Sequence, residues 1–216
     1  GLFQNARETF FRLRKLNRKN ISVDILTVLN KYNESDCFAI SEYIRHNFKP
    51  DNHLFLFARG NPLDKTALDF NIQNYQNICN YELTKIYDYE NRPFSFLFRN
   101  INKTVQDIIL QTKILNKKII DCKAGNKLIV VYSDGDILPC ELLNTQLGNL
   151  KNFNYNINKI LRTDTYNKTL KFIKDTGCSC TWECAIGASV IYNPSYWLKI
   201  IYHTISDIIK SKFRIS

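Results

Sequence analysis

The sequence predicts an α/β fold, and three observations carry this prediction. Two short runs rich in apolar and β-branched or aromatic residues, at 21–30 and 53–60, have the character of buried parallel strands. The segment between them has helical periodicity, so strand, helix and strand follow as in a right-handed βαβ unit. The sequence pattern changes from Cys122 onward, where a predicted pair of strands and a cysteine-rich segment replace the alternation of helix and strand. We therefore expect a mainly parallel sheet followed by a smaller second part.

Length and composition place the chain among folded globular proteins. It has 216 residues, of which 44% are hydrophobic and 23% charged, enough for one domain or two small ones. No apolar run approaches the roughly 18 residues needed to cross a bilayer, and the first 20 residues lack the features of a signal peptide. We therefore expect a cytoplasmic protein. The sequence starts at Gly1 and contains no methionine, from which we expect a fragment of a longer chain.

The formal charge of +10 is compatible with nucleic acid, an acidic membrane surface or an anionic ligand as partner. The densest basic run, at 12–19, lies on a segment whose apolar residues recur at helical spacing. Its charges therefore belong to a solvated helix face. Because no basic groove motif with interleaved aromatic residues accompanies it, we expect neither a nucleic-acid partner nor a membrane partner.

The first part of the chain alternates between helix and strand. Asn33 or Ser35 is expected to cap the helix between the two strands. The expected elements are a helix over 3–18, a strand over 21–30, a helix ending near 48, a strand over 53–60, and helices over 71–87 and 101–117. The state of 91–100 stays open, because this segment contains a proline and has no clean period.

The second part begins with a β-hairpin. Two apolar runs within 126–143 flank the turn Ser133-Asp134-Gly135-Asp136, whose Asp-Gly pair is a hairpin signal. A loop over 143–152, a helix over 156–174 and a cysteine triplet follow. The closing helix within 193–213 is amphipathic, with one apolar face formed by Trp197, Ile201, Ile205, Ile208 and Ile209. We divide the chain into 1–117 and 118–216.

The seven cysteines form two groups. Cys37 and Cys79 lie in helical patterns, where an isolated cysteine is usually a small buried hydrophobe. The other five are candidate metal ligands and crowd the second part: Cys122, Cys140, Cys178, Cys180 and Cys184. In a reducing compartment such a group favours a metal site over disulfides.

The expected hairpin explains how separate cysteines could meet. A hairpin that turns back through Gly135 brings Cys122 and Cys140 to one end, and the triplet supplies further thiols from a loop and a helix start, where thiolate is favoured. Four thiolates from two segments suit a structural zinc ion or an iron–sulfur cluster. The spacing alone does not decide among a zinc site, an iron–sulfur cluster and a group of buried cysteines without a metal. A site with four ligands would also leave one of the five cysteines unused.

The cysteine pattern resembles a known family. Cys122, Gly135 and Cys140 form C-x₁₂-G-x₄-C, and LGNL at 147–150 and CSCTWEC at 178–184 follow. This order is similar to the twitch or SPASM-type region of radical S-adenosylmethionine (radical SAM) enzymes, and the shorter twitch form is the closer match. The resemblance implies an auxiliary [4Fe–4S] cluster held by Cys122, Cys140 and two of the triplet, with Cys180 and Cys184 favoured. Trp182 is expected to pack over it.

The first part also resembles that family. The segments VDILTVLNKYN and HLFLFARGNPLD look like late strands of its partial (β/α)₆, TIM-like barrel. The resemblance implies that 1–117 is the C-terminal portion of this barrel and 118–216 the twitch or SPASM-like domain. Cofactor and substrate of such barrels lie at the carboxyl ends of the strands. Thr27, Asn30 and Arg59 are therefore expected near S-adenosylmethionine or substrate.

One departure from the family limits what this chain can do alone. The C-x₃-C-x₂-C motif of the radical SAM cluster is absent from the 216 residues. We expect that motif in a missing N-terminal part, and this chain alone to be inactive on S-adenosylmethionine. The resemblance implies a parent enzyme that uses a 5′-deoxyadenosyl radical, an electron-donor protein and a peptide, sugar or small-molecule substrate. The alternatives are a zinc-stabilised, non-catalytic binding module and a truncated scaffold protein.

Overall fold

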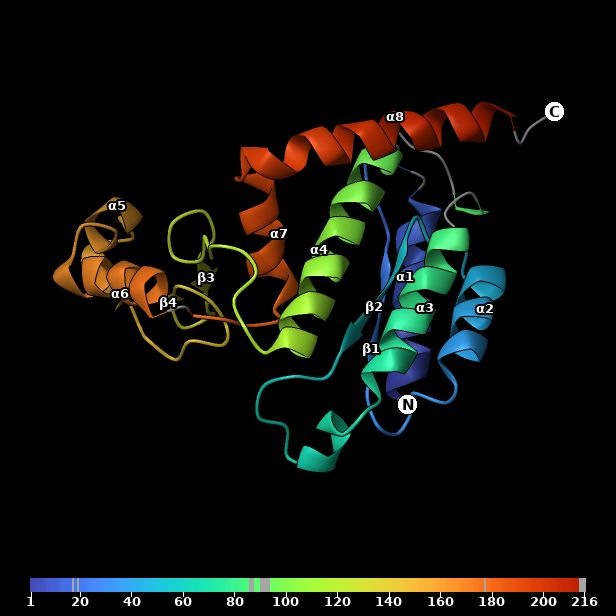
Figure 1. Cartoon of the computed structure of the whole chain (residues 1–216). Helices are drawn as coiled ribbons and strands as arrows, with labels where there is room; N and C mark the ends of the chain where they lie inside the picture. The colour runs from blue at the N-terminus through green and yellow to red at the C-terminus, as the bar shows by residue number, and fades with distance from the viewer. Residues whose placement is uncertain (17, 19, 86–87, 90–93, 177, 214–216) are drawn as a thin grey trace. The chain divides into compact units, whose positions relative to one another are not determined.

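The structure is a computed structural model that describes residues 1–16, 18, 20–85, 88–89, 94–176 and 178–213. It is a helix-rich α/β protein with two small sheets (Figure 1). The chain divides into two compact units, Gly1–Phe96 and Leu97–Ser216. None of the helices in the described ranges combines the length and the apolar character needed to cross a membrane.

The first unit contains the predicted βαβ arrangement. The strands β1 and β2 pair in parallel, with Ile25 opposite His53 and Leu29 opposite Phe57 (Figure 1). The elements are α1 (Leu2–Lys15), β1 (Ile25–Leu29), α2 (Cys37–Asn47), β2 (His53–Phe57), the 3₁₀ helix η1 (Lys65–Leu68) and α3 (Ile72–Thr84). The prediction of an α/β unit with a parallel strand pair is confirmed, although both strands are shorter than expected.

The start of one helix in the first unit differs from the sequence prediction. The helix α2 begins after Asp36, so the predicted cap at Asn33 or Ser35 is wrong. The Asn33 side chain instead accepts a hydrogen bond from the Asn30 backbone N–H at 2.9 Å, closing the turn that follows β1. Residues 86–87 of the expected helix over 71–87 lie outside the described residues, as do 91–93 of the undecided segment.

Part of the core of the first unit lies on one face of β2, and a second buried cluster joins Phe10 of α1 with Val23 and Phe48. The residues of β2 alternate, with His53, Phe55 and Phe57 buried, and the Phe57 ring lies 5.0 Å from the ring of Tyr75 on α3. In β1, by contrast, the alternate residues Leu26 and Val28 have exposed side chains, at 57% and 48%. An apolar groove of about 1040 Å³ runs along β1 and is lined by residues of α1, β1 and α2.

The second unit starts at Leu97, inside the long helix α4 (Ser95–Leu115), and contains most of that helix. Its elements, counting α4 from its first residue, are α4 (Ser95–Leu115), β3 (Val130–Val131), β4 (Asp136–Leu138), β5 (Gly148–Asn149), η3 (Leu150–Phe153), α5 (Ile157–Ile160), α6 (Asp164–Asp175), α7 (Glu183–Ile191), η4 (Pro194–Tyr196) and α8 (Trp197–Phe213). The compact units therefore divide about 20 residues before the boundary at 117/118 chosen from sequence. Within the second unit, Asn100 Nδ2 on α4 donates to Asp207 Oδ2 on α8 at 2.9 Å.

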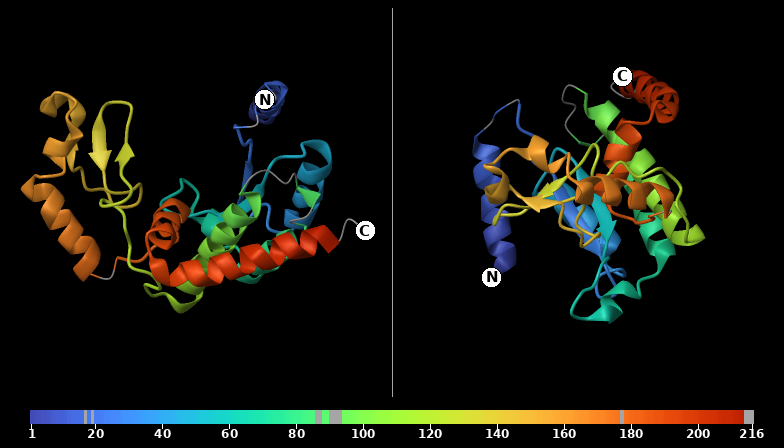
Figure 2. Two further views of the ribbon diagram at one scale, coloured as in Figure 1. Left: turned by 90° about the horizontal axis from the view of Figure 1, so that it is seen from above. Right: turned by 90° about the vertical axis from the view of Figure 1, so that its left-hand side faces the viewer.

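The predicted hairpin is confirmed as β3 and β4, which pair antiparallel with Val131 opposite Ile137. Gly135 has a φ of 97°, the left-handed region that a tight turn requires there. Residues 148–149, predicted as loop, form a third strand, β5, beside β4. The expected helix over 156–174 is interrupted between α5 and α6, because Thr163 caps a new helix by accepting from Tyr166 N–H at 3.2 Å. Figure 2 shows the hairpin beside α5, and Ile137 and Ile160 share a buried cluster.

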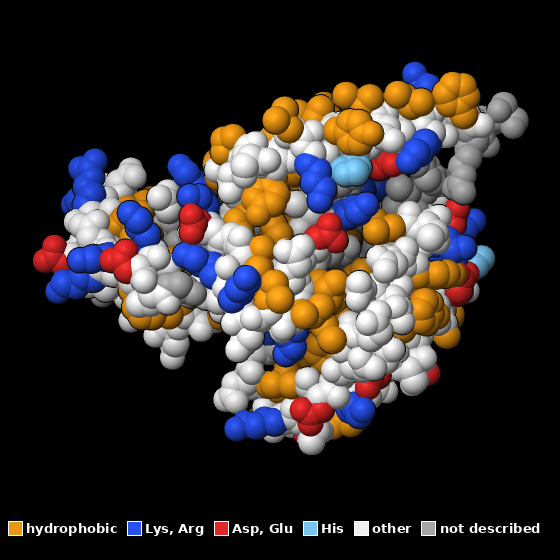
Figure 3. Space-filling model, viewed as in Figure 1, with side chains coloured by type: hydrophobic (Ala, Val, Ile, Leu, Met, Phe, Trp, Pro, Cys, Tyr) orange, Lys and Arg blue, Asp and Glu red, His pale blue; other side chains and the backbone are white. Residues whose placement is uncertain are grey.

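The closing helix α8 has its apolar side turned outward. Ile200 is buried at 1% exposure, and Thr204 and Asp207 lie on the covered side. The exposed side carries Leu198, Ile201, Tyr202, Ile205, Ile208, Ile209 and Phe213. Figure 3 shows this apolar surface along α8. The predicted amphipathic pattern is thus present, with the larger apolar side exposed.

Candidate metal centre

Cys122 and Cys140 are brought together by the turn that follows Cys122. Gly125 N–H donates to Leu128 O at 2.7 Å and to Pro139 O at 3.1 Å, so the segment after Cys122 is hydrogen-bonded to the residue before Cys140. Gly125 has a φ of 78°, and an added Cβ would lie 2.8 Å from Leu170 Cδ2. The backbone conformation therefore favours glycine at this point, and an added Cβ would also require the Leu170 side chain to move.

The cysteine triplet approaches from the segment between α6 and α7. Trp182, the residue preceding α7, is 3% exposed and belongs to a buried cluster with Cys140. The other members of this cluster and the residues packed against it are Ala124, Ala185, Cys122, Leu128, Val130, Leu143 and Cys180. Trp182 therefore packs among the thiols, where it shields them from water.

Four thiols lie within electrostatic range of one another. Every pair among Cys122, Cys140, Cys178 and Cys180 interacts, each thiolate disfavouring ionisation of another. Burial is the larger effect; it raises the pKa of Cys122 and Cys178 and raises the pKa of Cys180 to about 11. The raised pKa values keep Cys122, Cys178 and Cys180 protonated in the protein alone, and a bound metal would have to displace these protons.

Backbone N–H groups point at three of these sulfur atoms. Ala124 N–H donates to Cys122 Sγ at 3.4 Å, and Leu143 N–H donates to Cys140 Sγ at 3.2 Å. The backbone N–H of Trp182 makes the corresponding bond to Cys180 and opposes the rise of its pKa. Such bonds favour the thiolate over the thiol, and they are among the contacts that tune metal–thiolate sites.

The remaining cysteines occupy different surroundings. Cys184 lies on α7 and is exposed, and it is not among the described residues that line the cavity beside Cys122, Cys178 and Cys180. Cys37 on α2 and Cys79 on α3 are buried at 2% and 8% exposure, as expected for small hydrophobes. All seven cysteines are thiols, so no disulfide competes for them.

The chemical type of these side chains and their grouping in the fold fit a metal group bound by thiolates. It consists of four thiols, three backbone N–H donors and a largely apolar surrounding. In the described part of the chain, however, no three His, Cys, Asp or Glu side chains lie close enough to share a metal ion. Binding would therefore have to draw the thiols closer together, as is common when metal and fold are coupled.

The residues predicted near S-adenosylmethionine lie in the first unit. Asn30 follows β1 and Arg59 follows β2, so both lie beyond the carboxyl ends of adjacent parallel strands. Asn30 Oδ1 accepts from Tyr32 N–H at 2.8 Å and so shapes the turn. Thr27 lies inside β1 instead, with its Oγ1 2.9 Å from His53 Nε2. The structure thus brings Asn30 and Arg59 to one sheet edge and joins Thr27 to a buried network. Their role in cofactor binding stays a prediction.

Sequence reasoning missed a buried carboxylate network and a cation near the thiols. Glu82 on α3, 8% exposed, accepts hydrogen bonds from Ser41 and Tyr89, and Glu82 Oε1 lies 3.4 Å from His53 Nδ1. Lys118 lines the cavity that Cys122 and Cys178 also line. No sequence signal identified Glu82, because its partner Ser41 is 41 residues away.

Comparison with protein families supports an iron–sulfur assignment for this region. Residues 122–185 match the SPASM family, an iron-sulfur cluster-binding domain. The matched segment starts at Cys122 and contains all five candidate cysteines. We therefore describe 122–185 as a SPASM-type domain, the kind of domain that binds iron–sulfur clusters. Comparisons with curated proteins and with solved structures found no match.

Proposed function

We propose that the SPASM-type domain binds one auxiliary [4Fe–4S] cluster through Cys122, Cys140, Cys178 and Cys180. The observation that carries this proposal is the grouping of these four thiols within the matched segment: Cys122, Cys140 and Cys180 share a packed cluster, and Cys178 lines a cavity together with Cys122 and Cys180. The choice of Cys178 and Cys180 replaces the pair Cys180 and Cys184 favoured from sequence. It is supported by the exposure of Cys184 and by the cavity that Cys178 and Cys180 line together.

The chain's own residues would bind, shield and tune such a cluster. A bound iron–sulfur cluster supplies a site that accepts and donates single electrons. Ala124, Leu143 and Trp182 would donate backbone N–H bonds to the sulfur ligands, and the buried Trp182 indole would keep water away. Hydrogen bonds to the sulfurs and limited solvent access are the levers by which a protein sets the cluster's reduction potential.

Anaerobic reconstitution tests the cluster and its ligands. The wild-type chain is incubated with ferrous iron and sulfide, and both are then counted per chain. We expect about four iron atoms per chain, as a [4Fe–4S] cluster requires. Alanine at Cys122, Cys140, Cys178 or Cys180 should strongly reduce the iron content, while Cys184→Ala and the matched control Cys37→Ala should retain it.

Two results would change the proposal. One zinc per chain without iron would replace the cluster by a structural zinc ion, since four thiolates suit both. Loss of iron in Cys184→Ala, together with its retention in Cys178→Ala, would return the ligand set to Cys180 and Cys184. Alanine is preferred to serine here because a serine oxygen could itself act as a ligand.

We further propose that this region belongs to a radical SAM enzyme, in which the first unit continues a larger parallel sheet. Two observations support this. In the described residues the first sheet has two strands, and parallel sheets normally have more strands and both faces covered. The apolar groove of about 1040 Å³ lies beside β1, where a further strand would pair. Because the chain lacks C-x₃-C-x₂-C, it should not cleave S-adenosylmethionine by itself.

A further inference from the structure

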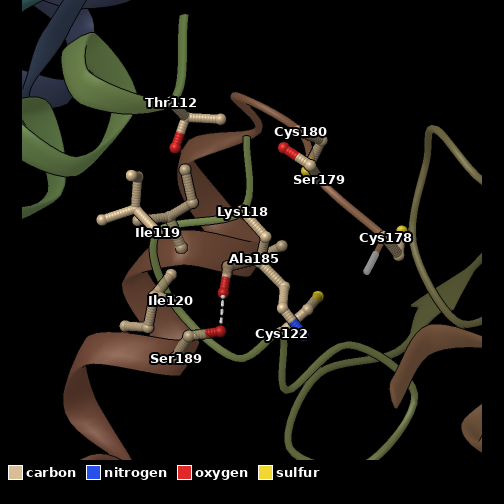
Figure 4. A pocket seen from close by; sticks show the side chains of 11 residues that line it. Thr112, Lys118, Ile119, Ile120, Cys122, Cys178, Ser179, Cys180, Ala185 and Ser189 are labelled. Carbon is tan, nitrogen blue, oxygen red and sulfur yellow. Dashed lines mark hydrogen bonds between the residues drawn. The ribbon is translucent and has the colours of Figure 1, made fainter. Parts of the chain in front are cut away.

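A small cavity lies beside the candidate cluster ligands. Its volume is about 20 Å³, and it is bounded by the end of α4, the connector after α4, the cysteine segment and α7 (Figure 4). Cys122, Cys178 and Cys180 contribute three of its lining side chains. The rest of the described lining is apolar or uncharged except for Lys118, which therefore contributes the cavity's one charged side chain.

The backbone and an ion pair fix the position of Lys118. The helix α4 ends at Leu115, and Asn116 adopts a φ of 46°, which turns the chain out of the helix. Lys118 follows within the connector, with its side chain 27% exposed, and its Nζ lies 3.0 Å from Asp121 Oδ1. Asp121 directly precedes Cys122, so the ion pair brings the ammonium group toward the segment that carries the first candidate ligand, but the Asp121 side chain is 79% exposed and the pair is correspondingly weak.

The charge of Lys118 lies beside the thiols. Lys118 lines the same cavity as Cys122, Cys178 and Cys180, so its ammonium group is the charge that the described cavity lining offers to these sulfur atoms. Lys123 follows Cys122 directly in the sequence and is a second nearby cation. Solvent screening weakens the charge of Lys118, because its side chain is partly exposed.

We propose that Lys118 is a positioning residue that acts as the counter-ion of the cluster site. This inference rests on the proposed function. A cluster held by four thiolates carries net negative charge, and adding one electron makes that charge more negative. A positive charge lining the adjoining cavity therefore favours cluster binding and favours the reduced state over the oxidised state.

The first experiment measures the midpoint potential of the reconstituted protein, using dithionite as the electron donor and electron paramagnetic resonance as the readout. Lys118→Met should lower the potential, because the reduced state loses its counter-ion, and Lys118→Arg should keep the wild-type value. Lys123→Met should shift it in the same direction by a smaller amount. The matched control is Lys159→Met, which removes an exposed charge on α5, outside the described cavity lining.

The second experiment measures the affinity for Co²⁺ from its thiolate absorption bands. Loss of an outer contact at a metal site typically costs about 10- to 100-fold in affinity, and we expect the lower end for the partly exposed Lys118. This titration needs no cluster, so it can be read even if the wild-type chain takes up no iron. Wild-type failure to bind iron would overturn the proposed function. Equal potentials, or equal Co²⁺ affinities, in Lys118→Met and wild type would overturn the role of Lys118.

A fold control separates charge from structure. The melting temperature of each variant is measured by circular dichroism before reconstitution. If Lys118→Met loses the cluster while Lys118→Arg keeps it at equal melting temperature, the positive charge is required for binding, as proposed. If both variants lose the cluster, the role of the charge is contradicted.

Discussion

Glu82 is a buried carboxylate held ionised by its neighbours in the first unit. Burial alone would raise its pKa, but the nearby His53 imidazole and the hydrogen bonds donated by Ser41 and Tyr89 lower it below the ordinary value of 4.5. Burial and the Glu82 charge also raise the pKa of Tyr89, which therefore stays a donor. Arg45 on α2 is the further charged group that acts on Tyr89. The network joins α2, α3 and β2.

The lowered pKa of Glu82 predicts a pH dependence of stability. Since the folded state binds the proton of Glu82 less tightly than the unfolded state, its contribution is complete above 4.5 and is lost as the pH falls below that value. Glu82→Gln should make the free energy of unfolding smaller at neutral pH, by about 1–3 kcal/mol. It should also flatten the fall of stability between about pH 5 and pH 3.

Urea unfolding of wild type and Glu82→Gln across this range checks the prediction. Glu8→Gln, at an exposed residue of α1, provides the control, and it should follow the wild-type curve. Identical slopes for wild type and Glu82→Gln would contradict the pKa direction assigned to Glu82.

Single residues differ in how far the sequence could predict them. The chemical type and crowding of the five cysteines identified the candidate site, and Trp182 was correctly expected to pack against it. The sequence could not decide among Cys178, Cys180 and Cys184, because that choice depends on how the segment before α7 folds. Glu82 and His53 pair across the fold, so no local pattern identified them.

The turn at Gly125 links the segment after Cys122 to the residue before Cys140. Gly125 has a left-handed φ of 78° and approaches Leu170 of α6. Gly60 has nearly the same φ of 79°, but its missing Cβ would meet nothing within 4 Å. The two glycines therefore separate the cost of backbone conformation from the cost of crowding.

We predict that Gly125→Ala destabilises the protein more than Gly60→Ala does. A left-handed alanine should cost about 1–3 kcal/mol at either site, and at Gly125 the clash with Leu170 adds to this cost. Gly125→Ala should also reduce iron uptake, because the turn links Cys122 to Pro139. Chemical unfolding and iron counting check both effects, and equal losses in the two variants would contradict the role of Leu170.

Elements with strong local signals were predicted well. The parallel pair β1 and β2, the hairpin with Gly135 and the closing helix all carry period or turn chemistry in the sequence. The predictions failed where a helix cap or the pairing with another strand determines the secondary structure. Thr163 begins a new helix within an unbroken helical pattern, and β5 is a strand because it pairs with β4.

The second unit contains every part of the candidate site. The five candidate cysteines, the cluster around Trp182 and the cavity beside Lys118 all lie after Leu97. A compact unit with its own core can fold independently.

We therefore predict that residues 97–216 fold alone and take up the same amount of iron per chain as the full 216 residues. Circular dichroism, cooperative melting and iron counting check this, with the Cys140→Ala fragment as the unloaded control. A fragment without cooperative melting would show that the first unit is needed for its fold.

At the scale of the whole molecule, the sequence predicted an α/β first part and a cysteine-rich second part. The family comparison supports the iron–sulfur assignment of 122–185. The boundary is harder to predict, because the sequence around α4 carries no strong linker signal, and α4 makes a tertiary hydrogen bond to α8, a helix about 100 residues later in the chain. The partial barrel stays a prediction, since its closure depends on strands that these residues do not contribute.

The open side of β1 also has a consequence for handling the protein. Its sequence, ILTVL, contains none of the lysines or prolines that commonly protect sheet edges, and Leu26 and Val28 are exposed beside it. Among the described strands, only β2 pairs with β1, although Val28 O accepts a hydrogen bond from Asn33 Nδ2 at 3.0 Å. A strand edge next to exposed apolar side chains can recruit strands from other copies. Concentrated samples should therefore scatter light increasingly with time, and Val28→Lys should delay this aggregation.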